Sequence, residues 1–149
     1  MPLQEASVII ATRNREPYLR DLLSSLCFQS FKDFEVIIVN DSGIPSSREK
    51  LENIVRAYLN KLEIKLLHNS RNLGVPVSLN HGASVASNEI LVFTDDDCIA
   101  DKDWLLNLVK WYSNQKVGGV GGRVIPIAVS YTHLRAHETR HDLVCRLLL

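Results

Sequence analysis

The sequence is poor in the residue types that mark several specialised classes of protein. Three of its 149 residues are cysteines (Cys27, Cys98 and Cys145), they lie far apart, and none belongs to a C-x-x-C pair. We therefore expect neither a disulfide framework nor a cysteine zinc site. We expect the protein to work in a reducing compartment. No apolar run approaches the roughly 20 residues of a membrane helix. The start lacks a basic segment leading into an apolar one, so no signal peptide is predicted.

The chain also lacks an excess of charge of either sign. Its 17 basic and 17 acidic side chains give a formal net charge of zero. This balance excludes a strongly basic nucleic-acid binder and an acidic disordered tail as descriptions of the whole chain. With 46% hydrophobic residues, one globular domain with its own core is expected. We expect a cytoplasmic location, or one at the cytoplasmic face of the membrane in a longer protein.

Apolar runs rich in β-branched residues alternate with segments of helical periodicity. The apolar runs predict strands at 7–11, 34–39, 63–67 and 89–94, and a glycine-rich run predicts another at 117–127. Strands and helices that alternate at regular spacing predict right-handed βαβ units. The predicted fold is therefore α/β, with a mostly parallel, Rossmann-like sheet flanked by helices.

Helix starts are indicated by proline and by capping residues. Pro17 suits the first turn of a helix, because that turn does not need the missing N–H. Ser46 and Glu49 have the spacing of a capping box at the start of the second helix. A helix of small residues is predicted at 77–86, and a further one after Asp101 or Asp103.

The composition changes at residue 130. Segment 130–149 holds three of the five histidines, His133, His137 and His141, and no turn signal joins it to the preceding strand. Their i, i+4, i+8 spacing is compatible with a metal-binding tract. We favour the alternative, that 130–149 is a non-native tail, because it resembles translated sequencing-adapter read-through. Residues 1–129 are then expected to be one domain, truncated at its C-terminal side.

Three polar clusters follow predicted strands directly: Thr12–Arg15, Asn40–Asp41 and Asp95–Asp97. In an open parallel sheet, ligands bind outside the carboxyl ends of the strands, so these clusters are expected to converge. Three adjacent carboxylates repel one another and need a cation, for which Mg²⁺ or Mn²⁺ with substrate phosphate is suited. The alternative for Asp95–Asp97 is a solvated turn that caps the next helix. Taken singly, Asp41 fits a turn residue, and the arginines fit solvated side chains.

Four motifs in order resemble family 2 glycosyltransferases, which have the GT-A fold. The resemblance covers residues 5–128, and its motifs are Ser7–Arg15, Glu35–Gly43, Asn72-x-Gly74 with Asn80-x-Gly82, and Phe93–Asp97 followed by Asp103–Leu105. It implies that 1–129 is the N-terminal portion of a nucleotide-sugar-binding domain. It also implies a role for each matching residue. These are Thr12, Arg13 and Arg15 in the nucleotide pocket, Asp41 at the base, Arg71 and Gly74 in the segment that closes over the nucleotide, Asp95 and Asp96 in donor binding, and Asp97 as the ligand of Mn²⁺ or Mg²⁺.

The resemblance implies transfer of a sugar from a nucleotide-sugar donor, most often UDP-linked, with inversion. The acceptor would be the hydroxyl of a saccharide or a lipid-linked molecule, as in cell-wall or polysaccharide biosynthesis. The catalytic base is unknown, because the family places it in its later half; Glu138 and Asp142 lie in the suspected tail. The turn Asn40–Gly43 also departs from the family's usual Asp-Asp-Gly-Ser. We therefore expect the chain as given to bind a donor but to be inactive in transfer.

Other functions are weighed against the same residues. A nucleotidyltransferase would have a glycine-rich loop after the first strand, whereas 12–17 contains no glycine. A receiver domain would place an aspartate pair there, and a Rossmann dehydrogenase would have G-x-G-x-x-G. A non-catalytic nucleotide-sugar sensor is the remaining alternative. Such a sensor retains binding without transfer, and the presence of Asp41, Asp95 and Asp97 argues against decay of the donor site.

Overall fold

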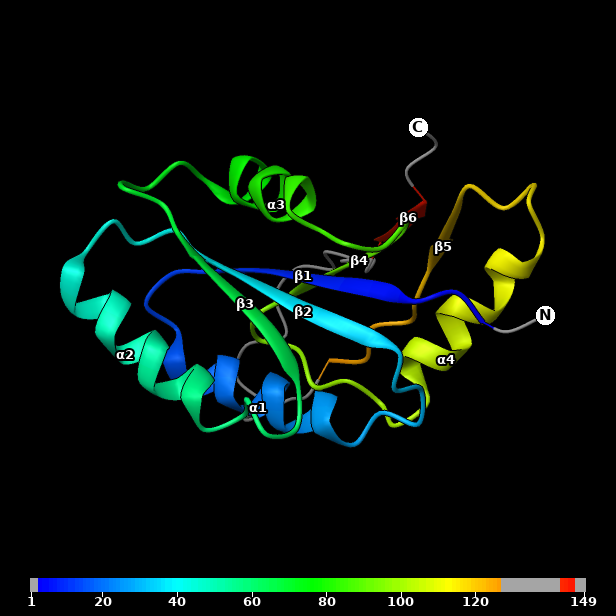
Figure 1. The fold of residues 1–149 in the computed structure, drawn as a ribbon, viewed down its shortest axis with the longest axis horizontal. Coiled ribbons are helices and arrows are strands. Elements are labelled where there is room, and N and C mark those ends of the chain that lie inside the picture. Colours follow the sequence, from blue (N-terminus) through cyan, green and yellow to red (C-terminus); the bar gives the residue numbers. More distant parts are fainter. Residues whose placement is uncertain (1–2, 127–142, 147–149) are drawn as a thin grey trace.

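The computed structural model describes residues 3–126 and 143–146, which form one sheet with helices on both faces (Figure 1). The strand order in this part of the chain is β3-β2-β1-β4-β6-β5. The parallel strands are β1 (Ala6–Thr12), β2 (Phe34–Asn40), β3 (Glu63–His68) and β4 (Ile90–Asp95). Strand β6 (Leu143–Arg146) pairs antiparallel with β4 and with β5 (Gly119–Gly121). The predicted α/β fold with a mostly parallel sheet is confirmed.

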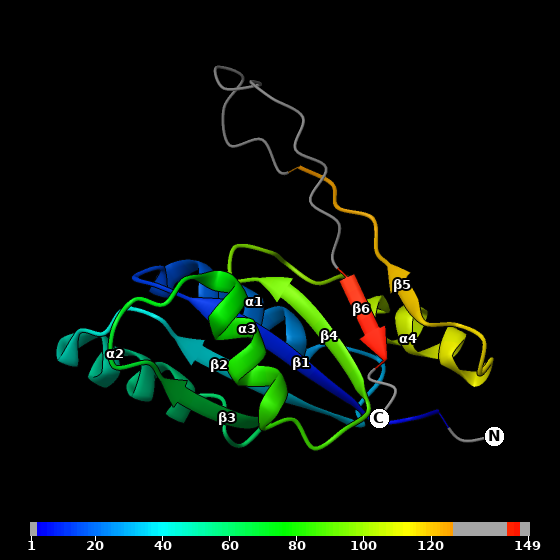
Figure 2. The ribbon, with the colours of Figure 1, turned by 90° about the horizontal axis from the view of Figure 1, so that it is seen from above.

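The helices form two layers around the sheet (Figures 1 and 2). One face is covered by α1 (Glu16–Cys27), α2 (Pro45–Arg56) and α4 (Trp104–Val109), which a 3₁₀ turn over Lys110–Ser113 extends; the other is covered by α3 (Val75–Ser84). Neighbouring residues of β1 serve different cores. Val8 and Ile10 pack against α1 and α2, whereas Ile9 packs against α3. This alternation explains why the strand is continuously apolar: both of its faces are buried.

The two long helices of the larger core both have a proline in their first turn, and only one of the predicted starts is right. α1 has Pro17 in its first turn, as predicted, and its buried stripe is Leu19, Leu22, Leu23 and Leu26. The predicted capping box of α2 is wrong, because Pro45 is the first helical residue and no side chain caps the helix. Ser46 therefore lies inside the first turn rather than before it. A helix can start at proline because its first N–H groups have no partner within the helix.

The glycine-rich segment forms much less strand than the sequence predicts. The predicted strand is 117–127; within its described residues, 117–126, only Gly119–Gly121 is paired, and its partner is β6. Glycines offer no side chain to pack and lose the most entropy on ordering, so a glycine-rich run makes a poor strand.

Strand β6 lies within the segment 130–149, and so it adds a strand that the sequence did not indicate. That this segment is a non-native tail stays a prediction. Its residues 130–142, with the three histidines, Glu138 and Asp142, lie outside the described part of the chain, as do 147–149. Within 3–126 and 143–146, no helix has the length and apolar character needed to cross a bilayer.

Candidate functional site

The three polar clusters converge at the carboxyl edge of the sheet. In the strand register, Thr12 lies opposite Asn40, and Ala11 lies opposite Asp95. A cleft of about 340 Å³ opens at this edge. Most of the predicted site residues line it: Thr12, Arg13, Arg15, Asp41, Gly74, Asp95 and Asp96. Arg71 and Asp97 are not among the residues that line it.

The acidic turn, Asp95–Asp97, is held from the loop after β1. The Thr12 hydroxyl donates to Asp96 Oδ2 at 2.8 Å. The Arg15 guanidinium lies 3.2 Å from Asp96 Oδ1 through Nη1, and its Nη2 donates to Asp97 Oδ2 at 2.8 Å. One arginine thus bridges two successive carboxylates. The sequence predicted that these carboxylates need a cation, and within the described residues part of that need is met by Arg15.

The charges of this cluster act on each other's protonation. Burial raises the pKa of the Asp96 carboxyl above its usual value, and the hydrogen bond from Thr12 and the charge of Arg15 oppose that rise. Burial acts to lower the pKa of Arg15, but the charges of Asp96 and Asp97 outweigh it and raise that pKa. Asp96 is 4% exposed, so it is the anchored member of the turn. The Asp97 side chain, 31% exposed, remains open to solvent.

Asp41 lies deep in the cleft and accepts hydrogen bonds from the loop that enters α3. Its Oδ1 accepts from Leu73 N and from Asn69 Nδ2, and its Oδ2 accepts from Gly74 N, each at 2.8 Å. Burial acts to raise the pKa of Asp41, but these hydrogen bonds outweigh it and hold that pKa below its usual value. The carboxylate therefore fixes the 72–74 loop, a role that the sequence did not indicate.

Two glycines with positive φ shape this wall of the cleft. Gly74 (φ 88°) precedes α3, and this backbone directs its N–H at Asp41. Gly43 (φ 67°) lies against the backbone of Arg71, where an added Cβ would come within 2.6 Å of Arg71 Cα. Only glycine populates such conformations readily. Arg71 thus packs its backbone against the turn after β2, and its side chain is exposed.

A family model described as glycosyl transferase family 2 matches residues 7–146. The chain belongs to this family. The match runs from the second residue of β1 to the end of β6 and includes every predicted site residue. It also extends into 130–149, where it ends with β6.

Relatives in family 2 are longer than this chain. It is 32% identical over 134 residues to the poly(ribitol-phosphate) β-N-acetylglucosaminyltransferase TarS of Staphylococcus aureus, and the match covers 83% of this chain and 23% of TarS. An uncharacterised glycosyltransferase of Haemophilus influenzae is 33% identical over 105 residues, or 70% of this chain and 32% of its own length. The chain therefore spans about a quarter to a third of the length of these two relatives.

Solved structures of family 2 and other glycosyltransferases share the fold. The TarS 1–349 structure in complex with UDP-GlcNAc superposes with a TM-score of 0.68 at 30% identity, covering 83% of this chain and 37% of that one. The mannosyltransferase PcManGT from Pyrobaculum calidifontis, solved with GDP-Man and Mn²⁺, has a TM-score of 0.72 at 24% identity. That match covers 80% of this chain and 35% of PcManGT. The second likeness shows the GT-A architecture alone.

The oxygen donors at the family 2 cleft fit a hard divalent ion in part. Within 3–126 and 143–146, no group of three or more His, Cys, Asp or Glu side chains is placed to share one metal. Mg²⁺ and Mn²⁺ do not require such a group, because they take one or two carboxylates and complete their shell with water and phosphate. Asp95 borders the cleft, whereas Asp97 does not line it and its side chain is 31% exposed. The oxygen atoms of Asp95 and Asp97 are of the kind that the ion prefers. Asp97 could bind the ion only after its ion pair with Arg15 is broken.

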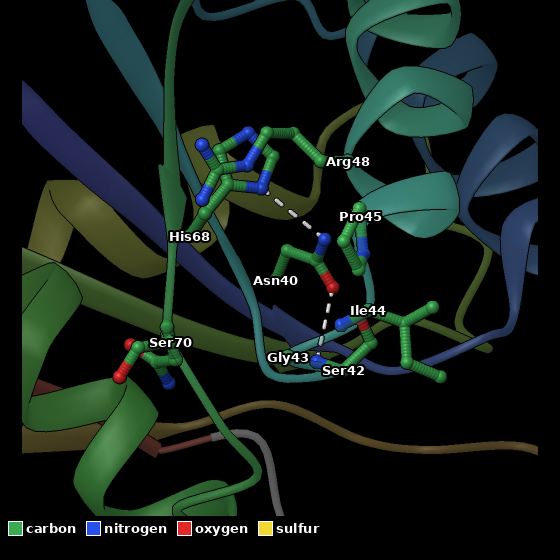
Figure 3. Close-up of a pocket in the computed structure, with 9 residues that line it drawn as sticks. Asn40, Ser42, Gly43, Ile44, Pro45, Arg48, His68 and Ser70 are labelled. Atoms are coloured by element: carbon green, nitrogen blue, oxygen red, sulfur yellow. Dashed lines mark hydrogen bonds between the residues drawn. The ribbon is translucent and has the colours of Figure 1, made fainter.

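A second cavity of about 250 Å³ lies beside the first, at the ends of β2 and β3 (Figure 3). Asn40 Oδ1 accepts from Ser42 N, so its amide nitrogen faces His68 Nδ1 at 3.2 Å. Arg48 and His68 both line this cavity (Figure 3). Burial lowers the pKa of His68, the charge of Arg48 adds to this, and Glu52 opposes it. The lowered pKa favours the neutral form of the His68 imidazole.

Sequence reasoning missed the residues that organise the 69–74 loop. Asn69 donates to both Asp41 and Ser78, and its Oδ1 lies 3.0 Å from His81 Nδ1. Asn69 follows β3 directly, as Asp41 follows β2. A polar residue after each strand was therefore the available signal, and applying it to β3 would have found Asn69.

Proposed function

We propose that this chain is the donor-binding part of a metal-dependent family 2 glycosyltransferase, and that its donor is a UDP-sugar. The observation that carries the proposal is that Thr12, Asp41, Asp95 and Asp96 line one cleft at the carboxyl edge of a parallel sheet. Ligands of open α/β sheets bind at this edge. In support, TarS, a relative at 30% identity, has been solved with UDP-GlcNAc.

Each part of the cleft has a task in donor binding. Asp41 and the 72–74 loop form the wall for the base and ribose, and the Arg71–Gly74 segment closes over the nucleotide. Arg13 and Arg15 face the diphosphate, where a guanidinium can bind two oxygens at once. Asp95 and Asp97 would hold Mn²⁺ or Mg²⁺, which supplies charge stabilisation for the departing nucleoside diphosphate.

Transfer needs a further group. In an inverting reaction, a carboxylate base takes the proton of the acceptor hydroxyl as that oxygen attacks the sugar. Residues 104–129 contain no Asp or Glu, and the base stays unassigned. The acceptor is a saccharide, lipid-linked or other hydroxyl compound, and cytoplasmic location belongs to the same proposal. The chain as given is expected to bind a donor without transferring the sugar.

Calorimetric titration of UDP with and without Mn²⁺ tests this function. Binding is expected to depend on Mn²⁺ and to weaken at least about tenfold, which corresponds to about 1.4 kcal/mol, in Asp97→Ala. The matched control is Asp21→Ala, which removes an equal charge from the exposed side of α1 and should leave binding unchanged. Metal-independent binding would favour a non-catalytic nucleotide-sugar module. No UDP binding by the unmodified chain would refute the proposal.

A further inference from the structure

The Arg15 guanidinium forms ion pairs with the acidic turn, Asp95–Asp97. Its two terminal nitrogens lie 3.2 Å from Asp96 Oδ1 and 2.8 Å from Asp97 Oδ2. The guanidinium carbon also lies 5.1 Å from the centre of the Tyr18 ring, a cation–π distance. Asp97 is the side chain through which a divalent ion would be held. Arg15 therefore already pairs with the carboxylate that the ion would use.

Simultaneous binding of the Arg15 guanidinium and a divalent ion to Asp97 is opposed by electrostatic repulsion between the two cations. A metal–oxygen bond of about 2.1 Å would bring the ion within about 5 Å of the guanidinium nitrogen. Like charges at that distance repel strongly, and Asp97 and Arg15 are only partly screened by solvent. The acidic turn thus has two alternative cations, one built into the chain and one from solution.

The cleft can accept the Arg15 side chain when its ion pairs with the acidic turn are broken. This side chain is 42% exposed and also borders the cleft. The anchored residue of the turn, Asp96, keeps its hydrogen bond from Thr12 whether or not Arg15 is present. A rotation of the Arg15 side chain can therefore expose Asp97 and bring a planar fork of N–H donors into the cleft, a geometry that suits phosphate oxygens.

We propose that Arg15 is an exchangeable internal cation: it blocks Asp97 until a divalent ion displaces it, and it then binds the diphosphate of the donor. This inference rests on the proposed function, its first half on the metal site at Asp97 and its second half on the nucleotide donor. It predicts that one residue has opposite effects on two ligands, since Arg15 opposes the metal and favours the nucleotide. A residue with a purely structural role would shift both affinities in the same direction.

The first measurement is Mn²⁺ binding without nucleotide, followed by the loss of the free-ion signal in electron paramagnetic resonance. In Arg15→Gln, we expect about tenfold tighter Mn²⁺ binding, equivalent to about 1.4 kcal/mol. Arg15→Met, which keeps an unbranched side chain but carries no charge, should give the same gain, and Arg15→Lys should not. Arg20→Gln on α1 is the charge-matched control, since Arg20 is exposed; it should change Mn²⁺ affinity less than twofold.

The second measurement is UDP binding at saturating Mn²⁺, in the same variants. Arg15→Gln is expected to bind UDP about tenfold more weakly, because a charge-assisted contact to phosphate is lost. Mn²⁺ binding in Arg15→Gln and Arg15→Met no tighter than in Arg20→Gln, or undetectable in all variants, overturns the exchange. Tighter Mn²⁺ binding with unchanged UDP binding overturns the transfer to the diphosphate. Failure of the unmodified chain to bind UDP refutes the proposed function. The Mn²⁺ titration still tests, independently of UDP, whether Arg15 opposes metal binding.

Discussion

At the scale of single residues, the cleft depends on carboxylates whose hydrogen bonds are made within the protein. Asp41 is 4% exposed and accepts two backbone and one side-chain N–H groups. A buried charge is tolerated only when it is paired or well hydrogen-bonded. Asp41 therefore positions the 72–74 loop as well as bordering the cleft, and the base contact implied by the family resemblance stays a prediction.

Replacing Asp41 with asparagine tests this positioning role. An amide offers one acceptor oxygen, so Leu73 N or Gly74 N loses its hydrogen bond to residue 41, and Gly74 N keeps only the longer bond of 3.2 Å to Asn72 Oδ1. The free energy of unfolding should fall by about 1–3 kcal/mol. Urea unfolding measures this change, and hydrogen exchange at the Gly74 amide should accelerate. Asp33→Asn, at an exposed position, is the control. An unfolding midpoint equal to that of the control would show that the loop does not depend on the carboxylate.

At the scale of elements, α3 lies unusually close to the sheet. A Cβ on Gly82 would meet Ile9 Cγ2 at 2.6 Å and Val39 Cγ2 at 3.2 Å. The smaller core, formed by Ile9, Ile37, Val39 and Leu91, is packed against Leu79 and Ala83 of this helix. The position of α3 matters for the site, because its first turn carries the loop that Asp41 holds.

Gly82→Ala should destabilise the protein although alanine is the better helix former. The gain in helix propensity is about 1 kcal/mol, whereas overpacking a core typically costs about 1–3 kcal/mol. We expect a lower melting temperature in thermal unfolding followed by circular dichroism. Gly118→Ala is the matched control, since a Cβ there meets nothing within 4 Å, and its stability should be unchanged or slightly higher. A higher melting temperature for Gly82→Ala would contradict the close packing.

At the scale of the whole molecule, the carboxyl ends and the amino ends of the parallel strands have different structural roles. The carboxyl edge is open as the cleft, and the amino edge is tied together by Glu35 of β2. Glu35 accepts from Ser7 Oγ of β1 and from Ser87 N, both at 2.6 Å, and lies 2.7 Å from Lys65 Nζ of β3. Burial acts to raise the pKa of Glu35, but these partners outweigh it and lower that pKa.

The lowered pKa of Glu35 gives a pH dependence of known sign. A carboxyl group whose pKa is lower in the folded state stabilises the fold above its unfolded pKa of about 4.3 and loses that contribution as pH falls through the folded pKa. Glu35→Gln should lower the free energy of unfolding by about 1–3 kcal/mol at pH 7 and by less near pH 3. Urea titrations at both pH values measure this change. The control is Glu49→Gln, at an exposed position of α2. An equal loss at both pH values would show that the charge of Glu35 is not involved.

The sequence by itself determined the layers and the edge at which the site lies. Continuous apolar runs such as 7–11 require burial on both faces, and βαβ connections then put Thr12, Asp41 and Asp95 at one edge. Tertiary structure alone decided which charges meet. Arg15 and Asp97 lie 82 positions apart, Asp41 and Gly74 lie 33 apart, and no local periodicity links such pairs. Local patterns report what a chain must bury, whereas the partner of a polar group depends on where distant loops end in space.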